Sequence, residues 1–185
     1  MPPIRFADPE VPRAVYAVRT ENREMIVIRS ILIGAVAGMR AMTPLAAVSD
    51  AARRGALSAD NGGPALLAHP LVSAGTKLLA AGELLGDKLP SAPDRVIIPG
   101  LAARLVTGAV AGAALAPRSR RPTAALLGAA VAVGAAYLTF NVRMRSMRRF
   151  GQASTGAVED AITVGAALWI VNGAKPDKAG RSLSR

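Results

Sequence analysis

Residues 106–115 read Val-Thr-Gly-Ala-Val-Ala-Gly-Ala-Ala-Leu, a stretch that is apolar or small at every position. A helix on the surface of a soluble protein alternates an apolar and a polar face with a period of 3.6 residues. This stretch has no polar face, so a helix built from it is buried on all sides by protein or by lipid. Because 51% of the chain is hydrophobic and only 3% is aromatic, we predict an integral membrane protein rather than an alanine-rich soluble bundle.

The rest of the chain contains further apolar stretches, separated by segments rich in charged residues, glycine and proline. A helix that crosses a membrane needs about 17–25 mostly apolar residues. Five stretches approach that length: 25–48, 65–87, 96–116, 123–140 and 155–171. We therefore predict an all-α, polytopic transmembrane helix bundle with about five spans, four to six being the range. The domain covers residues 25–173, between a polar tail at 1–24, expected to be disordered, and another at 174–185. The composition shift at Met25 leaves open that translation starts there.

The 185 residues carry 23 Lys and Arg against 12 Asp and Glu, a net charge of +11. The basic residues are spread over every loop and both tails, which argues against a nucleic-acid interface on one face. The expected partners are the lipid bilayer of the cell membrane and its anionic headgroups. One basic run is expected to contact headgroups: Arg143, Arg145, Arg148 and Arg149.

Membrane orientation is only weakly indicated. Five spans place the N-terminal tail on the same side as the loops at 88–95 and 141–152. Basic residues are slightly more frequent on that side, so the positive-inside rule favours an internal N-terminus. Without residues 1–24 the bias reverses, and the orientation stays open.

Small residues predict close helix packing. Glycines recur four residues apart at Gly34 and Gly38, at Gly82 and Gly86, and at Gly108 and Gly112. This spacing puts both glycines on one helix face, where two backbones can approach closely within lipid. Such faces are also compatible with a homo-oligomer. The segments 34–38 and 108–112 are identical, which fits either an ancient duplication or low complexity.

Charged residues inside the apolar stretches are the candidate functional residues. A charge at the centre of a membrane helix costs about 2.5–3.5 kcal/mol on insertion scales, so such residues pair or line a wet cavity. The acids are Glu83, Asp87, Glu159 and Asp160, and the arginines are Arg40 and Arg104. Pro44 is expected to loosen the first helix because it lacks an amide donor. Thr43 is expected to bind a carbonyl that this releases.

Two functions fit these residues. In the first, the protein transports or conducts a small ion or polar solute. The four acids then line the path, and Arg40 and Arg104 are their counter-ions. In the second, the protein is a non-transporting scaffold or a lipid-interacting protein, and the same charges only fasten helices. The chain has no cysteine and no recognisable catalytic motif, so we expect no enzyme activity, no metal site and no cofactor.

Three segments resemble a bacterial membrane family catalogued as domain of unknown function 4126. They are Gly38-Met-Arg-Ala-Met-Thr-Pro44, Gly82-Glu-Leu-Leu-Gly-Asp-Lys-Leu-Pro90 and Val158-Glu-Asp-Ala161. The second segment is the most specific, and the resemblance covers residues 28–172. It implies a small multi-span membrane protein, and it assigns no activity and no role to the charged positions.

Overall fold

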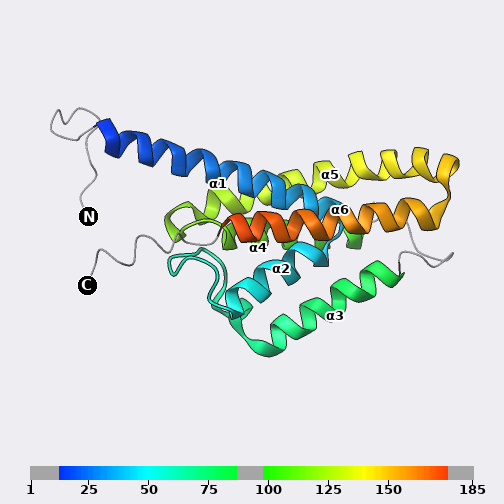
Figure 1. The fold of residues 1–185 in the computed structure, drawn as a ribbon, viewed down its shortest axis with the longest axis horizontal. Coiled ribbons are helices and arrows are strands. Elements are labelled where there is room, and N and C mark those ends of the chain that lie inside the picture. The colour runs from blue at the N-terminus through cyan, green and yellow to red at the C-terminus, as the bar shows by residue number, and fades with distance from the viewer. Residues whose placement is uncertain (1–12, 87–97, 175–185) are drawn as a thin grey trace.

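The computed structural model describes residues 13–86 and 98–174, and within them the chain is all α-helical, as predicted. Two short 3-10 turns join helices, at Ala65–Ala68 and Arg118–Arg120. The α-helices are α1 (Arg13–Met39), α2 (Met42–Arg53), α3 (Pro70–Gly86), α4 (Ile98–Ala114), α5 (Arg121–Phe150) and α6 (Gln152–Gly173). In Figure 1, α1, α5 and α6 run along the long axis, and α2 and α3 lie on one side of them.

Helix α5 is the packing centre for α1 and α4, and glycine makes this contact possible. A Cβ atom on Gly34 of α1 or on Gly108 of α4 would lie 2.6 Å from the carbonyl oxygen of Gly128 in α5. No side chain fits at that separation, so the close approach of the helices requires glycine there. The third predicted pair differs, because a Cβ on Gly82 or Gly86 would meet nothing within 4 Å in the described residues.

The stretch at 25–48 is not one continuous helix, so the expectation of a single first helix over these residues was wrong. Helix α1 ends at Met39 and α2 begins at Met42. Pro44 in the first turn of α2 cannot donate a helical hydrogen bond, and its ring would clash with the carbonyl of residue 40 in a continuous helix. In Figure 1 the chain turns back at this break, and α2 runs towards the end where α1 entered.

The α1–α2 hairpin changes which segments share an end of the bundle. Met25 and Arg29 of α1 line one cavity together with Leu57, which follows α2, and Ala174, which follows α6. The start of the apolar part of α1 therefore lies at the same end as the loop after α2, whereas the turn at 150–151 lies at the opposite end (Figure 1). The predicted grouping of the N-terminal segment with the 141–152 loop assumed a continuous first helix, and the structure places the two at opposite ends of the bundle.

Residues 13–24, expected to belong to a loose tail, form the beginning of α1. By length and hydropathy, two helical segments in the described residues qualify as candidate membrane spans, 118–149 and 154–173. Helix α4 is apolar but shorter. The predicted number of about five spans is not shown.

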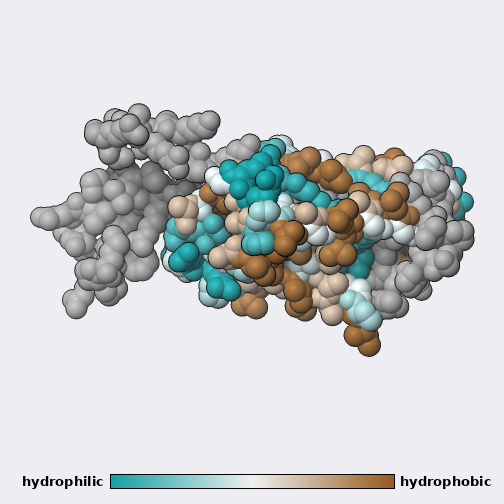
Figure 2. All heavy atoms as spheres, turned by 90° about the horizontal axis from the view of Figure 1, so that it is seen from below, coloured by the Kyte–Doolittle hydropathy of each residue, from teal (hydrophilic) through white to brown (hydrophobic). Residues whose placement is uncertain are grey.

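Large apolar side chains are exposed along the bundle. They include Leu71, Leu78 and Leu85, seven residues apart on α3, which are 76%, 74% and 68% exposed. Figure 2 shows hydrophobic residues spread along the middle of one face and hydrophilic residues gathered towards one end. A folded chain in water seldom leaves such extended apolar surface uncovered.

Candidate functional site

The break between α1 and α2 is stabilised by a carboxylate from another helix. Glu83 of α3 accepts a hydrogen bond from the amide of Ala41 at Oε1 and one from the amide of Met42 at Oε2, each 2.8 Å long. The first amides of a helix have no partner within that helix, and its dipole favours negative charge there. Ala41 has no side chain that can cap α2. Glu83 therefore supplies the cap.

The other side of the break receives a positive charge. Arg104 of α4 is 5% exposed, and its Nε donates to the carbonyl oxygen of Gly38, near the end of α1, at 3.1 Å. A second nitrogen of the Arg104 guanidinium donates to the carbonyl oxygen of Gly100 at 2.9 Å. The carbonyl end of a helix favours a cation. Each half of the hairpin thus meets a charge that complements its dipole.

Arg40 lies in the break and is only 1% exposed. Its Nε donates to Asp160 Oδ1 of α6 at 3.0 Å, and the two side chains form an ion pair. A guanidinium buried to this degree is tolerated in a protein interior only with a charged or strongly polar partner. Asp160 therefore ties the hairpin to α6.

A second ion pair joins α5 to α6. Arg143 donates to Glu159 Oε2 at 2.8 Å, and both side chains are about nine-tenths buried. Arg143 was expected to contact lipid headgroups, and that expectation was wrong because its side chain points inward to Glu159. The remaining members of the basic run, Arg145, Arg148 and Arg149, are exposed.

We call the six charged residues around the break the central charged cluster: Arg40, Glu83, Arg104, Arg143, Glu159 and Asp160. With every member ionised, its three positive charges balance its three negative charges. The sequence predicted all six as intramembrane charges except Arg143. It predicted Arg104 as a partner for Glu83, and the two attract each other electrostatically. Asp87, the fourth predicted acid, lies outside the described residues.

Thr43 does not do what the sequence predicted. Its side chain is 6% exposed, and its hydroxyl makes no hydrogen bond to the described residues. The carbonyl of Gly38 near the break is bound by Arg104 instead. Pro44 is buried beside Thr43 in the first turn of α2.

Thr43 lines a groove of about 270 Å³ between α2, α3 and α6. Lys77 and Asp50 also line this groove and form an ion pair. Arg54 binds Asp50 as well, at 2.6 Å. The hydrogen bond from Lys77, aided by the charge of Arg54, holds the pKa of Asp50 below its usual value, although burial opposes the shift. The sequence did not predict this pairing, because Lys77 and Asp50 come from separate helices.

A second groove, of about 260 Å³, lies between α5 and α6 and reaches Met39. Its walls are mostly apolar, and the ion pair of Arg143 and Glu159 forms part of them. We call it the α5–α6 groove. Its lining residues are Met39, Leu138, Thr139, Val142, Arg143, Ser146, Thr155, Val158, Glu159 and Ile162.

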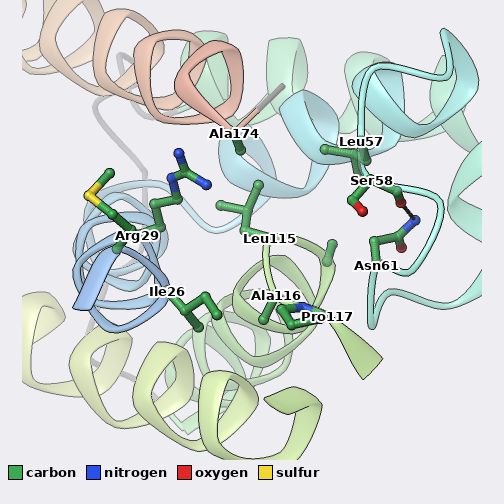
Figure 3. Close-up of a pocket in the computed structure, with 11 residues that line it drawn as sticks. Ile26, Arg29, Leu57, Ser58, Asn61, Leu115, Ala116, Pro117 and Ala174 are labelled. Atoms are coloured by element: carbon green, nitrogen blue, oxygen red, sulfur yellow. Dashed lines mark hydrogen bonds between the residues drawn. The ribbon is translucent and has the colours of Figure 1, made fainter. Parts of the chain in front are cut away.

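A cavity of about 330 Å³ lies at the end of the bundle where α1 enters. In Figure 3, Arg29 approaches it from α1, Leu115 projects into its centre, and Ser58 and Asn61 border the far side. Arg29 donates to the carbonyl of Gly173 at 2.5 Å, and Asn61 donates to the Ser58 carbonyl at 2.8 Å. These polar groups thus hold α1 against the end of α6 and hold the loop after α2 together.

Comparison of the chain with models of protein families, with curated proteins and with solved structures finds no match. The resemblance of three segments to a membrane family stays a prediction.

Proposed function

We propose that the chain is a multi-pass protein of the cell membrane, in which α3, α4, α5 and α6 cross the bilayer and the α1–α2 hairpin enters and leaves on one side. Two helical segments have the length and hydropathy of spans. Helices α3 and α4 have 17 residues each, or about 25 Å at 1.5 Å per residue. That length is close to the roughly 30 Å hydrocarbon core, and the exposed leucines of α3 suit lipid contact.

The charge distribution supports an orientation. The exposed arginines in or beside the loops at the end where α1 enters include Arg53, Arg54, Arg118 and Arg121. Those at the opposite end are, within the described residues, Arg145, Arg148 and Arg149. By the positive-inside rule, the hairpin opens towards the cytoplasm.

Within this membrane protein, the central charged cluster holds the helices together and does not carry a solute. The protein is then a lipid-interacting scaffold. The observation that carries this proposal is the double hydrogen bond from the amides of Ala41 and Met42 to Glu83. Irregular backbone at membrane depth is tolerated where its polar groups are satisfied by protein. Glu83 and Arg104 satisfy the two half-helix ends, and the paired charges leave no net charge to attract an ion.

Transport is the second candidate, and the α5–α6 groove favours it. Glu159 lines this groove and belongs to a buried ion pair with Arg143. A proton taken up by Glu159 would release Arg143, which would be the first step for a carrier of protons or small polar solutes. The apolar walls of the groove suit an alkyl chain better than a hydrated ion, so we place transport second.

Membrane insertion is tested with Trp169, the single tryptophan, which is 71% exposed on α6. We expect phospholipids brominated on their acyl chains to quench its fluorescence in vesicles that contain the protein. A water-soluble quencher should have little effect. Strong quenching from water with none from lipid would contradict insertion.

The choice between the two candidates is tested by proton flux into proteoliposomes under an imposed potential. If the protein is a scaffold, proton flux into the proteoliposomes should equal the leak into protein-free vesicles at every pH. A flux in the wild type that Glu159→Gln abolishes, with Asp60→Asn as the matched control on an exposed loop, would establish transport instead.

A further inference from the structure

We propose that the α5–α6 groove binds one anionic phospholipid of the surrounding bilayer. Its acyl chain lies against Leu138 and Val142, and its phosphate lies beside Arg145 and Arg149. The inference rests on the proposed membrane location and names the lipid class and the site. It differs from a general attraction of basic residues to membranes, because it assigns separate roles to neighbouring arginines.

One face of α5 changes from apolar to cationic beside the groove: Leu138 and Val142 line the groove, and Arg145 and Arg149 continue the same face outside its lining. Leu138, Val142, Arg145 and Arg149 follow one another at intervals of four, three and four residues in α5. Side chains at these intervals lie on the same face. Leu138 is 70% exposed and Val142 is 62% exposed, and both arginines are exposed. The face is therefore matched to a molecule with an alkyl chain and an anionic end.

The second wall changes in the same direction. Helix α6 runs back along α5 after the turn at Gly151 (Figure 1), so Thr155 lies nearer the turn than Val158 and Ile162. Val158 and Ile162 are exposed apolar residues, and the Thr155 hydroxyl has no hydrogen-bond partner in the described residues. Ser146 lines the same end of the groove. The two hydroxyls can donate hydrogen bonds to phosphate oxygens where the arginines supply the charge.

The charges select the class of headgroup. Glu159, the acid that lines the groove, is paired with Arg143, so the exposed guanidinium of Arg145 beside the groove adds positive charge at this end. Guanidinium groups bind phosphate through paired hydrogen bonds in a fixed geometry. The groove has about the volume of nine water molecules, which suits one alkyl chain rather than a bulky ring system. A zwitterionic lipid fits the walls but loses charge complementarity, because its ammonium group meets the arginines.

The test measures lipid binding to the purified full-length protein by native mass spectrometry. The probes are phosphatidylglycerol and phosphatidylcholine with identical acyl chains. We expect phosphatidylglycerol to bind about tenfold more tightly, and Arg145→Gln with Arg149→Gln to remove that preference. Arg148→Gln is the matched control, because Arg148 lies about a quarter turn away from the stripe, and this variant should keep the preference.

Two further variants keep the test decisive if the double arginine variant does not fold. Thr155→Val should weaken phosphatidylglycerol binding several-fold through one lost donor. Ile162→Trp should reduce binding of both lipids, because the ring fills the groove. Circular dichroism establishes that each variant is folded.

Three outcomes would overturn the inference. The first is a loss of preference in Arg148→Gln equal to that in the double variant, which would indicate diffuse attraction. The second is displacement of phosphatidylglycerol by an equal concentration of oleate, which would make a free fatty acid the ligand. The third is unchanged binding in Ile162→Trp. Lipid quenching of Trp169 separates these failures from failure of the proposed membrane location.

Discussion

Glu83 accepts a hydrogen bond from the amide of Met42 at 2.8 Å, although the two residues are 41 positions apart in the chain. The contact joins the first turn of α2 to α3, and within the described residues α3 packs mainly against α2 and the 3-10 turn before it. An interaction between an ionised carboxylate and the amide end of a half-helix combines a charge-assisted hydrogen bond with a favourable dipole. One side chain of α3 therefore contributes both to the hairpin and to the packing of α3, together with Arg104 at the end of α1 and the ion pair of Lys77 and Asp50.

Glu83→Ala should lower the free energy of unfolding by about 2–6 kcal/mol, because two largely buried amides lose their acceptor at about 1–3 kcal/mol each. Glu83→Gln should lower it less, because its amide oxygen still accepts one of the two bonds. Thermal unfolding in detergent measures both. Leu85→Ala, on an exposed position two residues away, is the control. Equal stability of Glu83→Ala and Leu85→Ala would refute the capping role.

The ion pair of Arg143 and Glu159 predicts strongly non-additive changes in the free energy of unfolding in a double-mutant cycle. Glu159→Leu alone leaves a buried guanidinium without its carboxylate, and removing one partner of such a pair costs about 3–5 kcal/mol. Arg143→Met with Glu159→Leu removes both charges and should restore most of that stability. Chemical denaturation of the four proteins measures the coupling. Additive losses in the double variant would show that the pair is not an energetic unit.

The glycine contact between α4 and α5 predicts a large difference between two similar substitutions. A Cβ on Gly128 would lie 2.2 Å from the carbonyl oxygen of Gly108, whereas a Cβ on Gly134 would meet nothing within 4 Å among the residues that the structure describes. Gly128→Ala should lower the free energy of unfolding by about 1–3 kcal/mol through overpacking. Gly134→Ala should raise it by up to about 1 kcal/mol through helix propensity. Similar stabilities of the two variants would contradict the packing.

Asp50 predicts a stability that depends on pH. Its pKa in the folded chain is lowered by Lys77, so ionised Asp50 stabilises the fold above its usual pKa of 3.8. That contribution is lost as the pH falls below 3.8 towards the lowered folded value. The melting temperature of the wild type should thus be higher than that of Asp50→Asn at pH 7. The difference between the two melting temperatures should shrink as the pH is lowered below 3.8. A gap that is constant or grows on acidification would exclude this linkage.

The sequence predicted the helical class and most of the central charged cluster, because apolar runs and the charges within them are local signals. Pro44 predicted a weakened helix but not the reversal of the chain, which depends on Glu83 and Arg104 from later helices. Arg143 was assigned to the surface with its basic neighbours. It faces inward because Glu159 of α6 lies opposite it. That contact depends on how α6 packs against α5, and the sequence of the basic run alone does not predict this packing.

The direction of the α1–α2 hairpin is the central claim, and thiol labelling tests it most directly. The chain has no cysteine, so Thr20→Cys, Ser58→Cys and Ser146→Cys each carry one thiol. Labelling with a membrane-impermeant maleimide on oriented vesicles should modify positions 20 and 58 from the same side and position 146 from the other. Modification of positions 20 and 58 from opposite sides would mean that residues 25–48 cross the bilayer, and it would contradict the hairpin.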